Sequence, residues 1–299
     1  MHEPVMVKEV AGAFGLTNAH LNRQVRIIDA TVGHAGHSVE FVKAHAKVLG
    51  IDMDKTMLAK AHERLTYACP TPMGECFILV QGNFRDIKEI ANTNNFSLVD
   101  GVLFDLGVSN IHLKSPIRGF SFSNPEADLD MRLDPDSQGV TAKDLLNVLD
   151  VTQLTRMFRV TMDFPHVKKL AKEVVNSRNI KPFQKVGDFL EVIQINAGKK
   201  TKLNPATKAF LAVRIAVNSE LDNLSSALPD AFAILRPGGR LVIISFHSGE
   251  DRLVKKYFRE TEMMGLGKVI TKKPLIPNEE EIKRNPRARS AKLRIIEKQ

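Results

Sequence analysis

One short segment of the chain combines an acid with two glycines in a way that suits a charged ligand. Asp29 follows the apolar run at residues 25–28, and Gly33 and Gly36 come next, without a G-x-G-x-x-G pattern. That pattern lets backbone N–H groups approach a pyrophosphate, which a carboxylate placed here would repel. The segment therefore argues against a nicotinamide dinucleotide, and hence against an oxidoreductase of that kind. It favours a ligand that carries an ammonium group.

Two more acids stand at the ends of later apolar segments. Asp52 closes one of them, where a carboxylate can accept hydrogen bonds from ribose hydroxyls. Asp105 closes another, and Asn83 and Phe84 offer an amide and a ring where an adenine would lie. Either acid alone could merely cap the segment that follows it. The set together predicts S-adenosylmethionine, which has an amine and two ribose hydroxyls.

The histidines near the first glycine turn do not indicate a metal site. His34 and His37 are three residues apart, but no third ligand stands nearby in the sequence. We therefore expect no metal. We expect His37 to pack and form hydrogen bonds at the start of a helix, near the ligand.

The elements that must position these residues alternate between strands and helices. Strands are predicted at 25–30, 48–52, 77–81, 99–106, 240–246 and 291–297. Helices are predicted at 38–46, 54–67, 151–160, 166–178, 184–197 and 206–234, with a further capped start where Asp144 follows Thr141 by three residues. The early strand–helix alternation is typical of a parallel, doubly wound sheet. Residues from about 112 to 215 hold no convincing strand, which indicates a helical domain inserted into that sheet.

Composition narrows the class of partner and the compartment. The chain has 43 basic and 34 acidic residues, a net charge of +9, with a basic tail after residue 283. Such an excess attracts polyanions, including nucleic acids. No apolar run approaches the roughly 18 residues that span a bilayer, so no membrane partner is expected. Cys69 and Cys76 could pair, but without His or further Cys at metal spacing we expect reduced thiols in the cytoplasm. The sequence leaves open whether the protein is a monomer or a homodimer.

Several ordered motifs along almost the whole chain resemble one family. They are H-E-P-V-M-V-K-E-V at 2–10, D-A-T-V-G-H-A-G-H-S at 29–38, D-G-V-L-F-D-L-G-V-S at 100–109, R-G-F-S-F at 118–122, L-D-M-R-L-D at 129–134, R-I-A-V-N-S-E-L at 214–221, P-G-G-R-L-V-I-I-S-F-H-S-G-E-D-R at 237–252 and N-P-R-A-R-S-A-K-L-R at 285–294. The chain resembles the RsmH (MraW) family of 16S ribosomal RNA cytidine N4-methyltransferases. The resemblance implies S-adenosylmethionine-dependent methylation of N4 of a cytidine in the decoding region (P site) of 16S ribosomal RNA in the small ribosomal subunit.

The resemblance also implies a fold and a domain layout. The fold would be a class I (Rossmann-like) S-adenosylmethionine methyltransferase fold of the α/β class, doubly wound and mostly parallel. Residues 1–111 and 209–299 would form the two parts of the methyltransferase domain, the second with the basic C-terminal tail. Residues 112–208 would form the inserted helical domain that recognises substrate.

Cofactor positions carry over from the family by motif. They fall on Ala35, Gly36, His37, Asp52, Phe84, Asp105 and His112. Three residues depart from the family pattern. Ala35 stands where the turn usually has glycine, His112 where glutamine is common, and Gly249 where leucine is expected. If residue 35 needs a positive φ, alanine costs on the order of 1 kcal/mol there.

Methyl transfer to an exocyclic amine is an in-line displacement, so the protein mainly positions and desolvates the reactants. The catalytic candidates are Asp105, Ser109 and His247. We expect Asp105 or a neighbouring carbonyl to accept a hydrogen bond from the amino group. The segment Phe246–His247–Ser248, with Glu250, Asp251 and Arg252, would hold the base or its phosphate; alternatively it is an acid–arginine network that shapes a loop.

The remaining candidates for RNA contact each have a plainer alternative. Phe120 and Phe122 would stack on a flipped base or belong to the core. Asn218 and Glu220 would help to line the site. Arg287 and Arg289 would bind phosphate or form a solvated basic end.

Two other readings of the whole protein stay open. A non-catalytic ribosome- or RNA-binding assembly factor on the same fold would show decayed cofactor motifs, and Ala35 and His112 lean slightly that way. A DNA amino-methyltransferase should show a Pro-Pro-aromatic motif after the fourth strand, where this chain has D-L-G-V-S.

Overall fold

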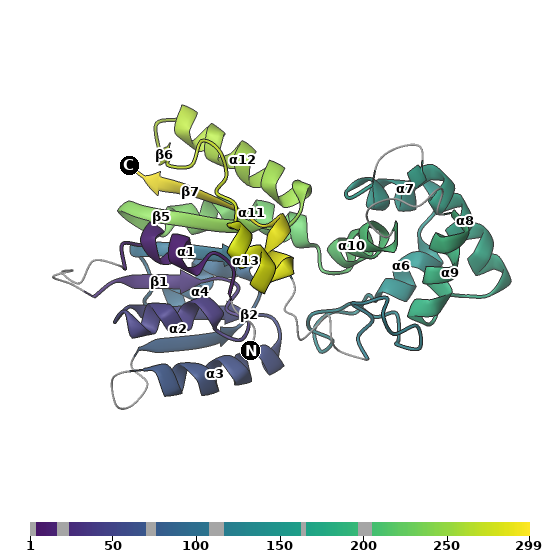
Figure 1. The fold of residues 1–299 in the computed structure, drawn as a ribbon, viewed down its shortest axis with the longest axis horizontal. Helices are drawn as coiled ribbons and strands as arrows, with labels where there is room; N and C mark the ends of the chain where they lie inside the picture. The colour runs from purple at the N-terminus through teal and green to yellow at the C-terminus, as the bar shows by residue number, and fades with distance from the viewer. Residues whose placement is uncertain (1–3, 17–23, 70–75, 108–116, 163–165, 197–204) are drawn as a thin grey trace. The chain divides into compact units, whose positions relative to one another are not determined.

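The protein forms two compact units, which we describe separately. A computed structural model describes residues 4–16, 24–69, 76–107, 117–162, 166–196 and 205–299. The first unit comprises Met1–Gly107 and Leu221–Gln299, and the second comprises Val108–Glu220 (Figure 1). In the part of the chain that the structure describes, no helix is long and apolar enough to cross a membrane.

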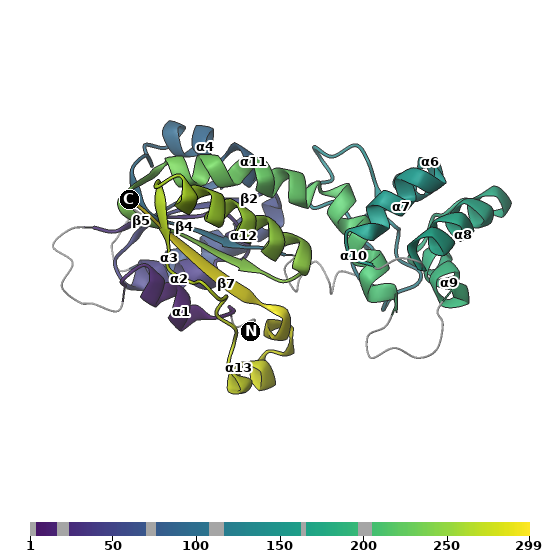
Figure 2. The ribbon, with the colours of Figure 1, turned by 90° about the horizontal axis from the view of Figure 1, so that it is seen from above.

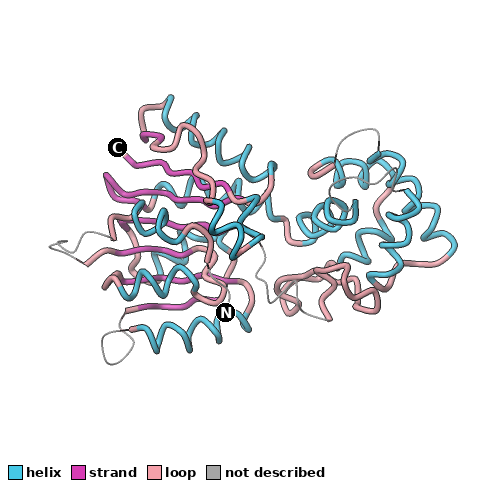
Figure 3. The backbone as a smooth tube through the Cα atoms, in the orientation of Figure 1, coloured by secondary structure: helices cyan, strands magenta, loops and turns pink. Residues whose placement is uncertain are grey.

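The first unit is built on one sheet, whose described strands run in the order β3-β2-β1-β4-β5-β7-β6 (Figure 3). The strands are β1 (Arg26–Asp29), β2 (Lys47–Asp52), β3 (Phe77–Gln81), β4 (Val99–Asp105), β5 (Leu235–Ser245), β6 (Gly267–Val269) and β7 (Lys292–Lys298). The pairs from β3 to β5 are parallel, and β7 is antiparallel to both β5 and β6. The predicted doubly wound, mostly parallel sheet is confirmed. Its strand order reverses direction between β1 and β4, which is where open α/β sheets bind ligands.

Helices cover both faces of this sheet (Figure 2). One layer contains α1 (Val7–Ala13), α2 (Gly36–Lys43) and α3 (Lys55–Ala68), and the other contains α4 (Ile87–Thr93), α11 (Glu220–Ala233) and α12 (Ser248–Met263). Consecutive strand residues point to opposite layers, as the pleat requires: Ile27 packs with the first layer and Ile28 with the second. Because both faces are buried, the central strands are apolar throughout. The short α13 (Glu279–Arg284) and the 3₁₀ helices η1 (Phe84–Asp86) and η2 (Pro286–Ser290) complete the unit.

The second unit is helical in its described residues. It contains α6 (Ala142–Val148), α7 (Val151–Arg159), α8 (His166–Ile180), α9 (Val186–Asn196) and α10 (Pro205–Val217). The predicted cap is confirmed, since Thr141 and Asp144 form a reciprocal capping box. Phenylalanines fill the core, where the ring of Phe189 contacts those of Phe158, Phe183 and Phe210.

The predicted single helix at 206–234 is wrong. Ser219 adopts φ +49°, which interrupts the helix and separates α10 from α11. Helix α10 packs with α7 and α9, so it belongs to the second unit. The structural boundary therefore falls after Glu220, later than the predicted boundary between residues 208 and 209.

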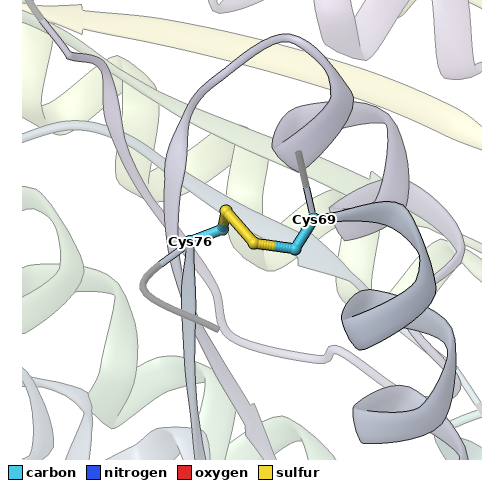
Figure 4. The surroundings of a disulfide bond; sticks show 2 residues. All are labelled: Cys69 and Cys76. Carbon is cyan, nitrogen blue, oxygen red and sulfur yellow. A yellow bond between two sulfur atoms is a disulfide. The ribbon is translucent and has the colours of Figure 1, made fainter. Parts of the chain in front are cut away.

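The expectation of reduced thiols is also wrong for this structure. Cys69 follows α3 and Cys76 precedes β3, and a disulfide joins them (Figure 4). Their Cα atoms are 6.0 Å apart. The crossover from β2 through α3 to the neighbouring parallel strand β3 brings the two cysteines together, which their spacing alone does not reveal.

We expect reduction of this disulfide to lower the free energy of unfolding by about 2 kcal/mol, from the entropy of closing so short a loop. Urea unfolding with and without a reductant measures the effect. In the double variant Cys69→Ser/Cys76→Ser, the reductant should change nothing. Equal stability of the oxidised and reduced wild-type protein would contradict the prediction.

Candidate functional site

The turns that follow β1, β2 and β4 are tied to one another at the carboxyl edge of the sheet. The Gly33 N–H donates to Asp52 Oδ2 at 2.8 Å, which links the first turn to the second. The Asp105 N–H donates to Thr31 Oγ1 at 2.7 Å, which links β4 to the first turn. These bonds fix the backbone before any ligand arrives, as a preorganised site requires. Thr31 was not predicted as a site residue, although a polar side chain directly after a strand end is a usable signal.

Asp29 is buried beneath the turn that follows β1, and its carboxylate is hydrogen-bonded within the protein. Only 2% of the residue is exposed. Its Oδ2 accepts a hydrogen bond from Ser38 Oγ at 2.6 Å, and its Oδ1 accepts one from the Thr31 N–H at 3.3 Å. The predicted contact between Asp29 and a ligand ammonium group is therefore not supported. The residue instead connects the end of β1 to the first turn of α2.

We expect the free energy of unfolding of Asp29→Asn, compared with that of wild type, to increase as the pH rises. Burial raises the pKa of the Asp29 carboxyl from 3.8 to about 6, although Ser38 and His37 oppose the shift. Between these values the folded state binds the proton more tightly than the unfolded state does. The resulting stability is fully present below pH 3.8 and is lost as the pH rises through about 6.

The shift corresponds to about 3 kcal/mol at about 1.4 kcal/mol per unit of pKa. Asparagine does not titrate, so the gain of the variant over wild type should grow by up to that amount between pH 4 and pH 7.5. Urea unfolding of both proteins across this range tests it. A difference between the two that does not change with pH would refute the assignment.

The glycine turn has an unusual backbone. Gly33 adopts φ +52° and Ala35 adopts φ +63°, so the alanine occupies the left-handed region that favours glycine. Ala35 is fully buried at the start of α2. Residue 35 therefore needs a positive φ, and alanine costs on the order of 1 kcal/mol there compared with the glycine usual in the family. Arg64 of α3 donates to the carbonyl of His34 at 2.8 Å and helps to hold the turn. No local sequence pattern marks Arg64, because it acts across 30 residues of chain.

His37 and Asp105 face each other at the edge of the sheet. His37 Nε2 lies 3.4 Å from Asp105 Oδ2, and 4% of the histidine side chain is exposed. Burial opposes protonation of the ring, but the neighbouring Asp105, Asp29 and Glu281 carboxylates raise the pKa of His37 above its usual range. We treat the contact as an ion pair, because its geometry is not that of a well-formed hydrogen bond. The predicted packing of His37 is present, since its ring stacks with Phe41.

Asp52 ends β2, and Phe84 follows β3, the neighbouring strand of the sheet. Asp52 Oδ1 accepts from the Asp54 N–H at 2.8 Å, so each carboxylate oxygen already has one backbone donor. The Asp52 carbonyl accepts from the Gly82 N–H at 3.0 Å, which ties the β3 end to the same turn. Phe84 is half-buried with its ring edge-on to Phe104.

His247 acts as a helix cap. Its Nδ1 accepts from the Gly249 and Glu250 N–H groups at 3.2 and 3.4 Å, while Glu250 Oε2 accepts from the Phe246 and His247 N–H groups. In the neutral ring, Nε2 therefore carries the proton; it lies 3.1 Å from Glu250 Oε1 but forms no hydrogen bond within the described residues. This arrangement does not suit a general base, so the structure favours a positioning role over the predicted catalytic one.

The charged residues around this cap divide into structural and exposed groups. Asp251 accepts from Arg294 Nε at 2.7 Å and from Lys292 Nζ at 3.1 Å, so it joins α12 to β7. That bond is the loop-shaping alternative named for this segment. The side chains of Arg252, Arg287 and Arg289 are exposed, and their contact with RNA stays a prediction.

Two predicted RNA contacts are structural within the second unit. Phe120 is 5% exposed and belongs to the core, which favours the plainer alternative, and its stacking on a base stays a prediction. Asn218 donates to the Met131 and Arg214 carbonyls and accepts from Leu133 N–H and Gln138 Nε2. Because these bonds use both donors and both lone pairs of the amide, a contact with RNA is not supported.

The remaining predicted residues are either in contacts within the second unit or outside the described residues. Glu220 forms a two-point ion pair with Arg214, at 2.8 Å for each bond. Phe122 packs edge-on against Phe210. Ser109 and His112 lie outside the described residues.

Comparisons with known proteins agree on one relationship. A family model described as the MraW methylase family matches residues 1–299. A protein of Carboxydothermus hydrogenoformans named Ribosomal RNA small subunit methyltransferase H is 41% identical over 317 residues, covering 99% of this chain and 97% of that protein. A protein of the same name from Dictyoglomus thermophilum is 40% identical over 301 residues, covering 100% of this chain and 97% of that protein.

Similarity to solved structures is weaker. A Streptococcus mutans protein described as a methyltransferase, solved in complex with SAH, is 15% identical with a TM-score of 0.47. The match covers 100% of this chain and 99% of that chain. Because this TM-score is low, we assign the fold from the strand order of the sheet and not from this similarity.

Proposed function

The chain belongs to the MraW methylase family, and from this premise we propose that it transfers a methyl group from S-adenosylmethionine to the ribosomal RNA of the small subunit. The observation that carries the proposal is the position of Asp52. Its carboxylate holds the glycine turn at Gly33, and it ends β2 at the ligand-binding edge of the sheet, where an acid accepts hydrogen bonds from ribose hydroxyls.

The residues of the site fit this cofactor. Asp52 would accept hydrogen bonds from the ribose hydroxyls, and the half-buried ring of Phe84 would lie against the adenine. The turn from Ala35 to His37 and the Asp105 carboxylate would hold the methionine half. Within the described residues, Asp105 Oδ1 is buried without a hydrogen-bond partner, as expected of an acceptor that a ligand completes. When bound, the cofactor supplies a methyl group made electrophilic by its sulfonium.

The target atom we propose is N4 of a cytidine in the decoding region of 16S ribosomal RNA, which follows from the family. The N4 lone pair is delocalised into the ring, so an acceptor on the amino group helps to localise it. Asp105 begins the D-L-G-V-S segment at the end of the fourth strand, and we propose that its carboxylate is this acceptor. His37, whose Nε2 lies 3.4 Å from Asp105 Oδ2, would balance the charge of the carboxylate and leave Oδ1 as the acceptor.

We expect Asp105→Asn to lower kcat by about 100-fold or more at saturating cofactor, which is the usual loss when an acid–base group is removed. Asparagine keeps the size of the side chain but cannot take a proton. Single-turnover methylation of small subunits, with the cofactor well above its Kd, measures the effect. Near-normal turnover under these conditions would exclude the catalytic role and leave Asp105 as a cofactor ligand.

The basic surface of the chain suits RNA. Arg252 on α12 and Arg287 and Arg289 on η2 are exposed and belong to the first unit, which also holds the cofactor residues. We propose that they contact phosphates and that the helical second unit contributes to recognition of a large, folded RNA. We place the protein in the cytoplasm, where small subunits are found.

The deciding experiment is mass spectrometry of nucleosides from small-subunit RNA. Unmethylated subunits are incubated with the protein and S-adenosylmethionine, and Asp52→Ala serves as the control. We expect new N4-methylcytidine with wild type and none with the variant. No new methyl mark, together with tight binding to the subunit, would replace the proposal with the non-catalytic assembly factor.

A further inference from the structure

A buried carboxylate outside the site connects the two ends of the chain. Glu281 of α13 is 8% exposed, and its Oε1 accepts a hydrogen bond from the Met6 N–H at 2.7 Å, across 275 residues of sequence. The cap residue Asn278 accepts from the Glu281 N–H at 2.8 Å and fixes the helix that carries the carboxylate.

Met6 is held in a conformation that it would not adopt freely. Its φ of +54° lies in the left-handed region, and the residue directly precedes α1 without a side-chain cap of its own. Met6 is 1% exposed, so its N–H cannot turn to water. A strained residue persists only when its surroundings fix it from several sides, and here Glu281 supplies the hydrogen-bonding part.

The segment that Met6 belongs to rests on the glycine turn. A Cβ added at Gly36 would lie 3.0 Å from Cβ of Pro4, so the proline ring packs against the bare Cα of the first residue of α2. Val5 and Met6 share a core cluster with Ala35, which also has a positive φ. Residues 4–6 therefore cover the backbone that would hold the methionine half of the cofactor.

We propose that Glu281 is a positioning residue for the cofactor turn: it anchors residues 4–6 against Gly36 and so keeps the turn from Ala35 to His37 ready for the cofactor. The identity of the ligand rests on the proposed function, whereas the mechanical link does not. The Glu281 charge also acts on His37, together with Asp105 and Asp29. Glu281 thus acts on the site in two ways: through its hydrogen bond to Met6 and through the effect of its charge on His37.

Calorimetric titration with S-adenosylmethionine tests the link. We expect Glu281→Ala to raise the Kd about tenfold, because the Met6 N–H loses its partner and the turn loses its cover. Glu281→Gln keeps an oxygen that can accept from Met6 and should restore most of the affinity. Glu280→Ala and Glu280→Gln change the exposed neighbour on the same helix and should bind as wild type does.

A second variant covers the case in which Glu281→Ala does not fold. Pro4→Gly leaves the Glu281–Met6 bond intact and removes all the side-chain atoms that contact Gly36, so it should also raise the Kd several-fold. Binding by Glu281→Ala or Pro4→Gly within twofold of wild type would overturn the proposal.

Two measurements need no cofactor, so they test the role of Glu281 separately from the identity of the cofactor. In NMR titration, Glu281→Gln should lower the pKa of His37, which a merely structural residue would leave unchanged. Amide exchange of residues 33–37 should be at least tenfold faster in Glu281→Ala than in Glu280→Ala. If wild type fails to bind S-adenosylmethionine, the proposed function fails; unchanged exchange and an unchanged His37 titration would overturn the role of Glu281 in either case.

Discussion

Gly119→Ala should destabilise the second unit by about 3 kcal/mol, enough to unfold a marginal domain. Gly119 adopts φ +66°, where a Cβ costs on the order of 1 kcal/mol. The added Cβ would also lie 2.3 Å from the Asp128 carbonyl oxygen and 3.3 Å from the Asp130 nitrogen. These are backbone atoms that cannot rotate away, so overpacking adds about 1–3 kcal/mol.

Gly139→Ala is the matched control in the same unit. A Cβ there meets nothing within 4 Å, and the residue has no positive φ, so stability should change by less than about 1 kcal/mol. Urea unfolding followed by helical circular dichroism, with amide exchange in α7–α9 to report on the second unit, compares the two variants. Equal midpoints for Gly119→Ala and Gly139→Ala would show that the turn at Gly119 differs from the structure.

The fold was predictable where one local signal suffices. The strand at 77–81 matches β3, because a short apolar run between turn residues is too short for a helix and the right length for a strand. The prediction at 240–246 starts late, since β5 begins at Leu235 and passes through Pro237 and both glycines. Those residues usually mark a turn, but here they accompany a register shift between β4 and β5.

The candidate site divides in the same way. Asp52 and Asp105 could be found from the sequence, because the carboxyl ends of the parallel strands β2 and β4 lie at the same edge of the sheet. The burial of Asp29 could not, since it depends on how Ser38 and the first turn of α2 close over it. Arg64 and Glu281 are linked to the turn by contacts between distant segments, and local patterns do not encode those contacts.

Asp52→Ala should raise the Kd for S-adenosylmethionine about 100-fold or more. The change removes the acceptor of the Gly33 and Asp54 N–H groups, at 2.8 Å each, as well as the proposed partner of the ribose hydroxyls. Hydrogen bonds to a charged group contribute about 1.5–3 kcal/mol each, and about 1.4 kcal/mol corresponds to a factor of ten in Kd. Loss of the ribose bonds alone therefore accounts for the expected change, and a looser glycine turn adds to it. Asp52→Asn should rescue little, because its NH₂ group would face one of two backbone donors.

The control for this variant is Asp86→Ala, which removes an exposed carboxylate two residues after Phe84 and should leave the Kd unchanged. Calorimetric titration gives the Kd values, and thermal unfolding of the free proteins shows whether both variants remain folded at the temperature used. A folded Asp52→Ala protein with wild-type affinity would mean that the cofactor does not bind at the turn that Asp52 holds. Loss of affinity in both variants to the same extent would mean that the general charge of this edge, and not the bonds of Asp52, decides binding. A loss confined to Asp52 ties the cofactor to the carboxylate that joins the turn after β1 to the end of β2.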